Sequence, residues 1–131
     1  MRTVIRSAVA ALMLSLASSG ASAHSMEPGY VKKYGSGIED TFYYVIKNDL
    51  DFPATFKVNV YEKDGKTLAD GWSVNRELFK IVPGNEKRFG IKVNSAVERK
   101  LLVCSELYKV GLKNEEPKII TRVCSRLWIR Q

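Results

Sequence analysis

The sequence predicts an all-β protein, an antiparallel β-sandwich of immunoglobulin-like type with about seven strands. Short runs rich in aromatic and β-branched residues alternate between apolar and polar positions, and turn signals separate them at near-regular spacing. Beyond the first 23 residues, no stretch shows a convincing helical period. A closed β-barrel is the alternative architecture for such a pattern.

The amino-terminal segment, residues 1–23, has the three parts of a secretory signal peptide. Arg2 and Arg6 form a basic start, Ala8–Leu16 is apolar, and Ala21–Ala23 provides the small residues of a cleavage site. The apolar run is too short to span a bilayer, so we expect no integral membrane protein after cleavage. Cleavage would leave a single domain in the periplasm, secreted, or at the cell surface.

The mature chain is basic. Loss of the two signal-peptide arginines leaves 19 basic and 14 acidic residues, a net charge of +5. Export argues against nucleic acid as a natural partner. A positive field of this size suits an acidic protein surface, a carboxylate or an anionic membrane.

The first mature segment, residues 24–40, holds four glycine or proline positions and little periodic apolarity. We expect an amino-terminal arm that becomes ordered on contact, with a short strand at Tyr30–Tyr34. The immunoglobulin-like domain should then occupy residues 41–131.

Within that domain, three segments are predicted to be strands because apolar and polar residues alternate or β-formers cluster in them: Thr41–Lys47, Thr55–Tyr61 and Glu86–Val93. The segment Trp72–Val82 is too irregular for one clean strand. Asn48-Asp49, Asp64-Gly65 and Pro83-Gly84 supply the intervening turns.

The last third of the chain predicts a hairpin of Lys100–Val110 and Lys118–Arg130. Folding the two runs about Asn114 sets Cys104 opposite Cys124, which fixes the register. In an exported chain these cysteines should form a disulfide that closes about 20 residues and contributes roughly 3 kcal/mol.

The same register places two further pairs on the cysteine face: Glu106 with Arg122, as an exposed pair of unlike charge, and Leu102 with Arg126. The opposite face, which contains Leu101 and Leu127, should belong to the core. A metal or redox role for the cysteines is disfavoured, because their spacing is not Cys-x-x-Cys and the chain has one histidine.

Catalytic motifs are missing from the sequence, so we expect no enzyme, no cofactor and no metal. It contains no Gly-x-Ser-x-Gly, no zinc-type cluster and no phosphate-binding glycine loop. One alternative is copper binding, since His24 at a mature amino terminus could chelate the metal with Met26 nearby.

Several segments together resemble the first domain of the periplasmic pilus-assembly chaperones of chaperone–usher systems. They are Val45–Asn48, Trp72, Leu78–Gly84, Arg88–Val93 and Arg99. The resemblance covers about 90 residues from Thr41 onward, without the second domain of those chaperones. In one branch of the family a disulfide joins the last two strands of the first domain, where Cys104 and Cys124 lie.

This resemblance implies that the last strand is lent to an incomplete pilus subunit by strand addition. The partner-binding face would hold Ile119, Val123, Leu127 and Ile129, although alternating apolar residues of this kind also suit a sandwich core. The resemblance further implies a carboxylate anchor of two basic residues, one from each of two pairs: Lys32 or Lys33, and Arg122 or Arg126.

The expected function is therefore that of an exported protein-binding domain. It would be a chaperone-like or accessory factor in pilus, surface-fibre or secretion-machinery assembly, and its partner would be a pilus or secretion subunit. The alternative is a structural component of such an assembly that docks through its arm, residues 24–40.

Overall fold

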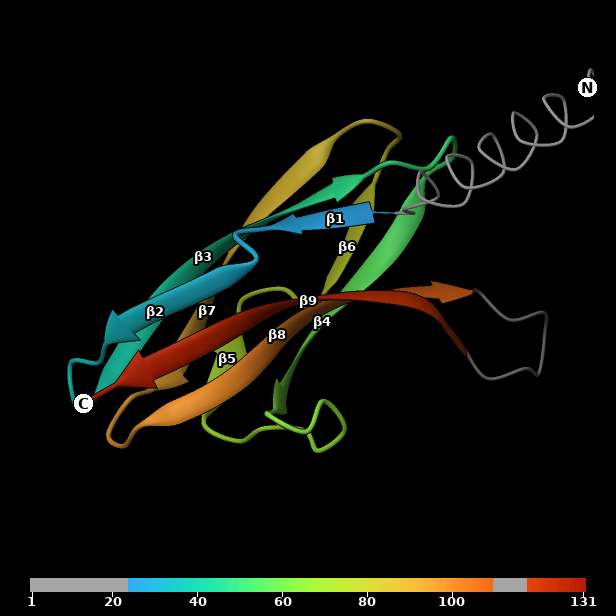
Figure 1. Cartoon of the computed structure of the whole chain (residues 1–131). Coiled ribbons are helices and arrows are strands. Elements are labelled where there is room, and N and C mark those ends of the chain that lie inside the picture. The colour runs from blue at the N-terminus through green and yellow to red at the C-terminus, as the bar shows by residue number, and fades with distance from the viewer. Residues whose placement is uncertain (1–23, 110–117) are drawn as a thin grey trace, which may run out of the picture.

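The computed structural model describes residues 24–109 and 118–131, and these residues form nine strands and no α-helix (Figure 1). The predicted signal peptide and the loop about Asn114 lie outside the described residues. No described helix is long and apolar enough to cross a membrane. The strands are β1 His24–Glu27, β2 Tyr30–Tyr34, β3 Glu39–Asn48, β4 Ala54–Glu62, β5 Trp72–Val74, β6 Leu78–Ile81, β7 Glu86–Asn94, β8 Arg99–Lys109 and β9 Lys118–Arg130.

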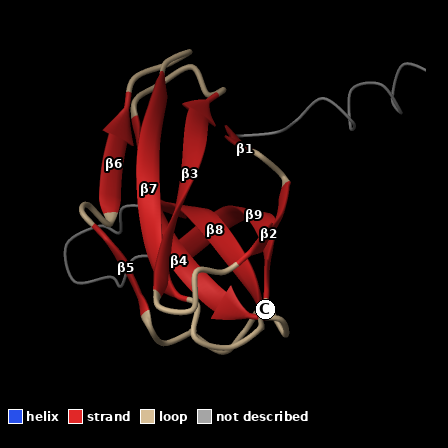
Figure 2. Cartoon of the chain, turned by 90° about the vertical axis from the view of Figure 1, so that its left-hand side faces the viewer, coloured by secondary structure: helices blue, strands red, loops and turns tan. Residues whose placement is uncertain are grey.

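Two sheets pack face to face, which confirms the predicted immunoglobulin-like sandwich (Figures 1 and 2). The four-stranded sheet has the order β1-β3-β7-β5, and the five-stranded sheet has the order β2-β9-β8-β4-β6. All pairings are antiparallel except that of β2 with β9, which is parallel.

The core lies between the sheets and follows the alternation seen in the sequence. On β4 and β7 every second residue is buried: Phe56, Val58 and Val60 on one strand, and Phe89, Ile91 and Val93 on the other. Because both inner faces are apolar, the two sheets exclude water from one continuous core.

The segment predicted to be an arm is built into the sandwich instead. The strand expected at Tyr30–Tyr34 is present as β2, whereas β1 was not predicted. In β1, His24 and Met26 are buried, and the strand pairs with the end of β3. The chain then crosses from one sheet to the other at Pro28 and Gly29, so β1 and β2 belong to different sheets.

The irregular segment Trp72–Val82 also divides between the sheets. Its first part, β5, pairs with β7, and its second part, β6, pairs with β4. In a segment that changes sheets, the residues that face the core do not follow one continuous alternation. This explains why the apolar residues of Trp72–Val82 show no single period of two.

Candidate functional site

Strand β9 has two halves with different neighbours. β8 pairs with it between Lys118 and Ile129, whereas β2 pairs only with Arg126–Arg130 (Figure 1). We call Arg126–Arg130 the closed half and Lys118–Ser125 the open half. No other described strand pairs with the open half, so one of its edges is free of strand pairing, although β1 lies close to β9.

The open half directs backbone hydrogen-bonding groups toward this free edge. Cys104 and Cys124 have Cα atoms 4.0 Å apart, the close spacing of a non-hydrogen-bonded pair, so the N–H and C=O of Cys124 point away from β8. The same parity holds further along, since Arg126 N–H donates to Gly29 O at 3.1 Å on the β2 side. By this alternation Arg122 also offers its N–H and C=O outward.

The four residues of the predicted partner-binding strand are divided between the halves. In the closed half, Leu127 is 1% exposed and Ile129 is fully buried, so both are core residues that no partner strand reaches. In the open half, Val123 is half-buried against the core and Ile119 is 48% exposed. Only the last two lie beside a free edge.

The predicted hairpin register is confirmed as far as Leu107, which faces Thr121, but it is wrong beyond that point. A bulge shifts the pairing, so Tyr108 faces Ile119 and not Ile120. One extra residue on β9 is accommodated there, and such bulges are common where a strand end leaves the body of a sheet.

The predicted disulfide joins β8 and β9 within the open half. The two sulfur atoms of Cys104 and Cys124 are 2.03 Å apart, and the bond spans 20 residues of sequence. Cys104 is fully buried. The disulfide therefore ties the open half to β8 at the place where β2 gives no support.

A buried carboxylate on β8, that of Glu106, faces the open half in register and joins β8 to β4. Glu106 is fully buried, and its carboxylate accepts hydrogen bonds from the Asn59 amide, from Tyr61 Oη at 2.7 Å and from Tyr108 Oη at 3.4 Å. Burial, followed by the adjacent Glu106 carboxylate, raises the pKa of Tyr61 to about 12. The phenol therefore stays protonated and donates to the carboxylate.

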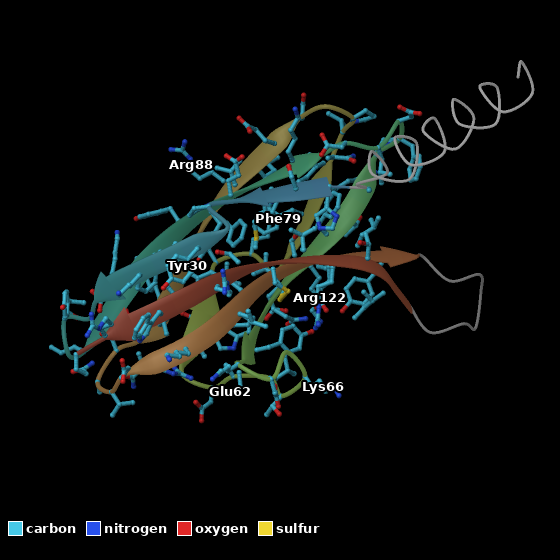
Figure 3. The ribbon with its side chains drawn as sticks, in the orientation of Figure 1. Tyr30, Glu62, Lys66, Phe79, Arg88 and Arg122 are labelled. Carbon is cyan, nitrogen blue, oxygen red and sulfur yellow. A yellow bond between two sulfur atoms is a disulfide. The ribbon has the colours of Figure 1, made fainter. Side chains whose placement is uncertain are left out.

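The expected exposed ion pair of Glu106 with Arg122 is wrong, although the two residues face each other in register. No salt bridge among the described residues joins them. Arg122 instead donates to Gly65 O at 2.9 Å and lies over the Tyr61 ring, 4.9 Å from its centroid. Figure 3 shows Arg122 beside the turn that carries Lys66.

The four candidate anchor residues do not form one cluster. Lys32 and Arg126 lie on the outer face of neighbouring strands. Lys32 Nζ is 4.6 Å from the Trp128 ring centroid, and Arg126 Cζ is 5.3 Å from the Tyr30 ring centroid. Lys33 follows Lys32 on β2 and so points to the other side of the strand. Arg122 lies roughly 13 Å further along β9 than Arg126.

The sequence did not reveal the surroundings of Trp128. Lys32 and Lys100 each place an ammonium 4.6 Å from its ring centroid, and Arg130 lies 5.1 Å from it. Its Nε1 donates to Glu98 Oε1 at 2.8 Å. The alternation of Arg126, Trp128 and Arg130 indicates that the three side chains share one face of β9. It does not indicate the two lysines, because these come from β2 and β8.

His24 is not an exposed metal ligand. It is 1% exposed, its ring lies 4.7 Å from the Phe56 ring, and its Nε2 donates to Ser105 O at 3.1 Å. Burial lowers the pKa of His24. The described residues contain no group of three side chains suited to holding a metal ion, and the buried ring removes the basis for the copper alternative.

Neither a protein-family model nor a curated protein sequence matches the chain. Solved structures do match. The Escherichia coli chaperone DraB has a TM-score of 0.59 and 21% identity, with 82% of this chain and 54% of that chain covered. A structure of the Salmonella enterica SafA pilin with the SafB chaperone matches with a TM-score of 0.59 and 19% identity, covering 82% and 53%.

The fold is also shared outside bacteria. WR4, an MSP family member of Caenorhabditis elegans, has a TM-score of 0.61 and 11% identity, with 82% of this chain and 98% of that chain covered. The chain spans about half the length of the chaperones it matches. It therefore resembles an immunoglobulin-like domain of the periplasmic pilus chaperones, as the sequence indicated.

Proposed function

We propose that this chain is an exported protein-binding domain that adds the open half of β9 to a sheet of a protein partner. Its role would be that of a chaperone-like or accessory factor in the assembly of pili, other surface fibres or secretion machinery. The observation that carries this proposal is the free edge of Lys118–Ser125, with outward backbone groups at Arg122 and Cys124. Strand addition uses such groups for affinity.

The fold resemblance supports the same role. The chaperone DraB and the SafB chaperone, which was solved with the SafA pilin, share the fold. For this chain we infer a periplasmic or cell-surface location and a pilus-type or secretion-type subunit as partner. We further infer that neither a cofactor nor an enzymatic step is involved.

The side chains of the open half suit a temporary edge. Ile119 is exposed and Val123 is half-buried, so together they offer apolar surface to a partner. The exposed Arg122 places a cation beside them. A cation discourages pairing with unselected strands and keeps the edge soluble until the partner arrives.

The alternative, docking through residues 24–40, has less support. β1 and β2 both pair with strands of the sandwich. Extending these residues to a partner would break both pairings and would expose the buried His24 and Met26.

The experiment that tests the proposal is a comparison of Arg122→Pro with Arg122→Ala. Proline removes the outward N–H and places its ring at the free edge, yet it removes no hydrogen bond to β8. Alanine removes the side chain and keeps the N–H. Each variant is co-expressed with a pilus-type subunit that lacks its last strand, and retained subunit is measured after purification.

Arg122→Pro should lose the subunit, while Arg122→Ala should retain most of it. Amide hydrogen exchange of the wild type should slow at Arg122 and Cys124 when the subunit is bound. Equal retention by both variants, with both shown to be folded by circular dichroism, would rule out pairing through this edge.

A further inference from the structure

We propose that a pocket on the outer face of the five-stranded sheet binds a soluble ligand that carries a doubly charged phosphate group on a small apolar or ring-shaped body. The pocket lies over the closed half of β9. It does not use the free edge of the open half, so this inference stands independently of the proposed function.

The pocket has a volume of about 400 Å³, a size typical of small-molecule sites. It takes residues from three neighbouring strands and from the segment after β4. Its lining is formed by Tyr30, Lys63, Lys100, Leu101, Leu102, Arg126, Leu127 and Trp128. Figure 3 shows Tyr30 at the β2 side of this face.

The described residues that line the pocket carry a net positive charge. Lys63, Lys100 and Arg126 contribute three cations, and no carboxylate lines the pocket. The salt bridges among the described residues involve Lys47 and Arg99 and none of these three cations. Three cations that face one pocket favour an anion of two or more charges.

The neighbouring carboxylates have partners of their own: Glu62 and Asp70 pair with Arg99, and Glu98 bonds Trp128. Glu98 Oε1 accepts the Nε1–H of Trp128 at 2.8 Å. This bond orients the indole and holds the Glu98 carboxylate at its nitrogen edge. The residue therefore fixes a wall of the pocket.

Two of the three cations, Arg126 and Lys100, lie over aromatic rings. Arg126 lies 5.3 Å from the Tyr30 ring centroid, and Lys100 Nζ lies 4.6 Å from the Trp128 ring centroid. A guanidinium that packs against a ring keeps N–H donors that can bind an anion. Because the side chains are already positioned, binding costs less conformational entropy.

The remaining lining determines the rest of the ligand. Leu102 is half-buried and Tyr30 is 48% exposed, so both present apolar surface beside the cations. An inorganic anion would leave this surface in contact with water. An aromatic or aliphatic body attached to the oxyanion would cover it, and this burial favours binding in proportion to its area.

The experiment uses the exported, 15N-labelled protein and titrates it with phenyl phosphate, inorganic phosphate and benzoate while amide chemical shifts are recorded. We expect saturable shifts in residues 100–102 and 126–128. Phenyl phosphate should bind at least tenfold more tightly than benzoate, which has the ring but a single charge, and more tightly than inorganic phosphate, which lacks the ring.

The matched variants separate the pocket from general charge. The double variant Lys63→Gln, Lys100→Gln should weaken phenyl phosphate binding at least tenfold. The control Lys80→Gln removes an exposed cation of β6 outside the pocket and should change binding less than twofold. Lys63→Glu provides a second test should the double variant not fold, and its loss of binding should be as large.

Three results would overturn the proposal. They are no saturable shift with phenyl phosphate, equal weakening by the pocket variants and by Lys80→Gln, and benzoate binding as tight as that of phenyl phosphate. A fourth arm uses vesicles of phosphatidylglycerol. Binding to vesicles with no response to phenyl phosphate would assign the face to a lipid surface and would overturn the soluble ligand.

Discussion

The two halves of β9 show how one strand can serve both as core and as a contact edge. The closed half has strands on both sides and places Leu127 and Ile129 in the interior. The open half has β8 on one side only, and Ile119 and Val123 retain exposed surface there. The difference lies in the neighbouring strand and not in the residue types, since both halves carry β-branched and apolar residues.

The largest expected effect comes from Leu127→Ala, which should lower the free energy of unfolding by about 3 to 4 kcal/mol because it leaves a cavity in the core. Val123→Ala in the open half should cost about 1 kcal/mol or less. Urea denaturation of both variants measures the contrast. Similar losses at the two positions would show that the halves are equally buried, and would remove the distinction between them.

The second effect concerns the disulfide, which supports the open half alone. Replacing Cys104 and Cys124 by alanine should destabilise the protein by about 2 to 3 kcal/mol, because the unfolded chain regains the entropy of the closed loop. Hydrogen exchange should accelerate in Arg122–Ser125 more than in Leu127–Arg130. Uniform acceleration along β9 would argue against separate support for the open half.

The third effect is a dependence on pH through His24, the only histidine of the chain. Burial lowers its pKa in the folded state below the usual 6.5. The unfolded chain therefore binds the proton more readily, so stability is complete above pH 6.5 and falls as the pH drops below it. The slope is at most about 1.4 kcal/mol per pH unit for one proton.

Urea denaturation between pH 5 and 7.5 measures this slope, and His24→Gln should reduce it. Because the His24 ring bonds Ser105 on β8, directly opposite Val123, acidification should loosen β1 behind the open half first. A wild-type slope that persists in His24→Gln would assign the effect to other groups.

The smallest effect on stability is expected for Ile119→Ser. The side chain is 48% exposed, so the free energy of unfolding should change by about 0.5 kcal/mol or less. Retention of the pilus-type subunit should nevertheless fall, because the partner loses an apolar contact at the free edge. Full retention would show that Ile119 lies outside the contact.

The sequence predicted the sandwich and most of the hairpin register because both depend on local signals. The alternation of apolar and polar residues predicts β4 and β7. The two cysteines lie at equal distances from the loop midpoint, and this predicts the register of β8 with β9. The register failed at Ile120, since a bulge depends on how the strand end leaves the sheet and has no signature in this sequence.

What the sequence could not reveal depends on contacts between distant segments. The residues His24–Glu27 lack β-branched side chains, and they become a strand only because β3 offers an edge and the core accepts His24 and Met26. The division of β9 has the same origin, because it is decided by where β2 pairs. A local pattern in Lys118–Arg130 cannot contain that information.

The position of the crossing at Pro28 and Gly29 determines the length of the open half of β9. Residues before it serve the four-stranded sheet, and residues after it cover β9, so its position sets how much of β9 stays free. At about 3.3 Å per residue the open half is roughly 26 Å long. Pairing of β2 with one residue more or fewer of β9 would shorten or lengthen the open half by about 3.3 Å. Changes in length at this one corner would therefore alter how much of β9 a partner strand could pair with.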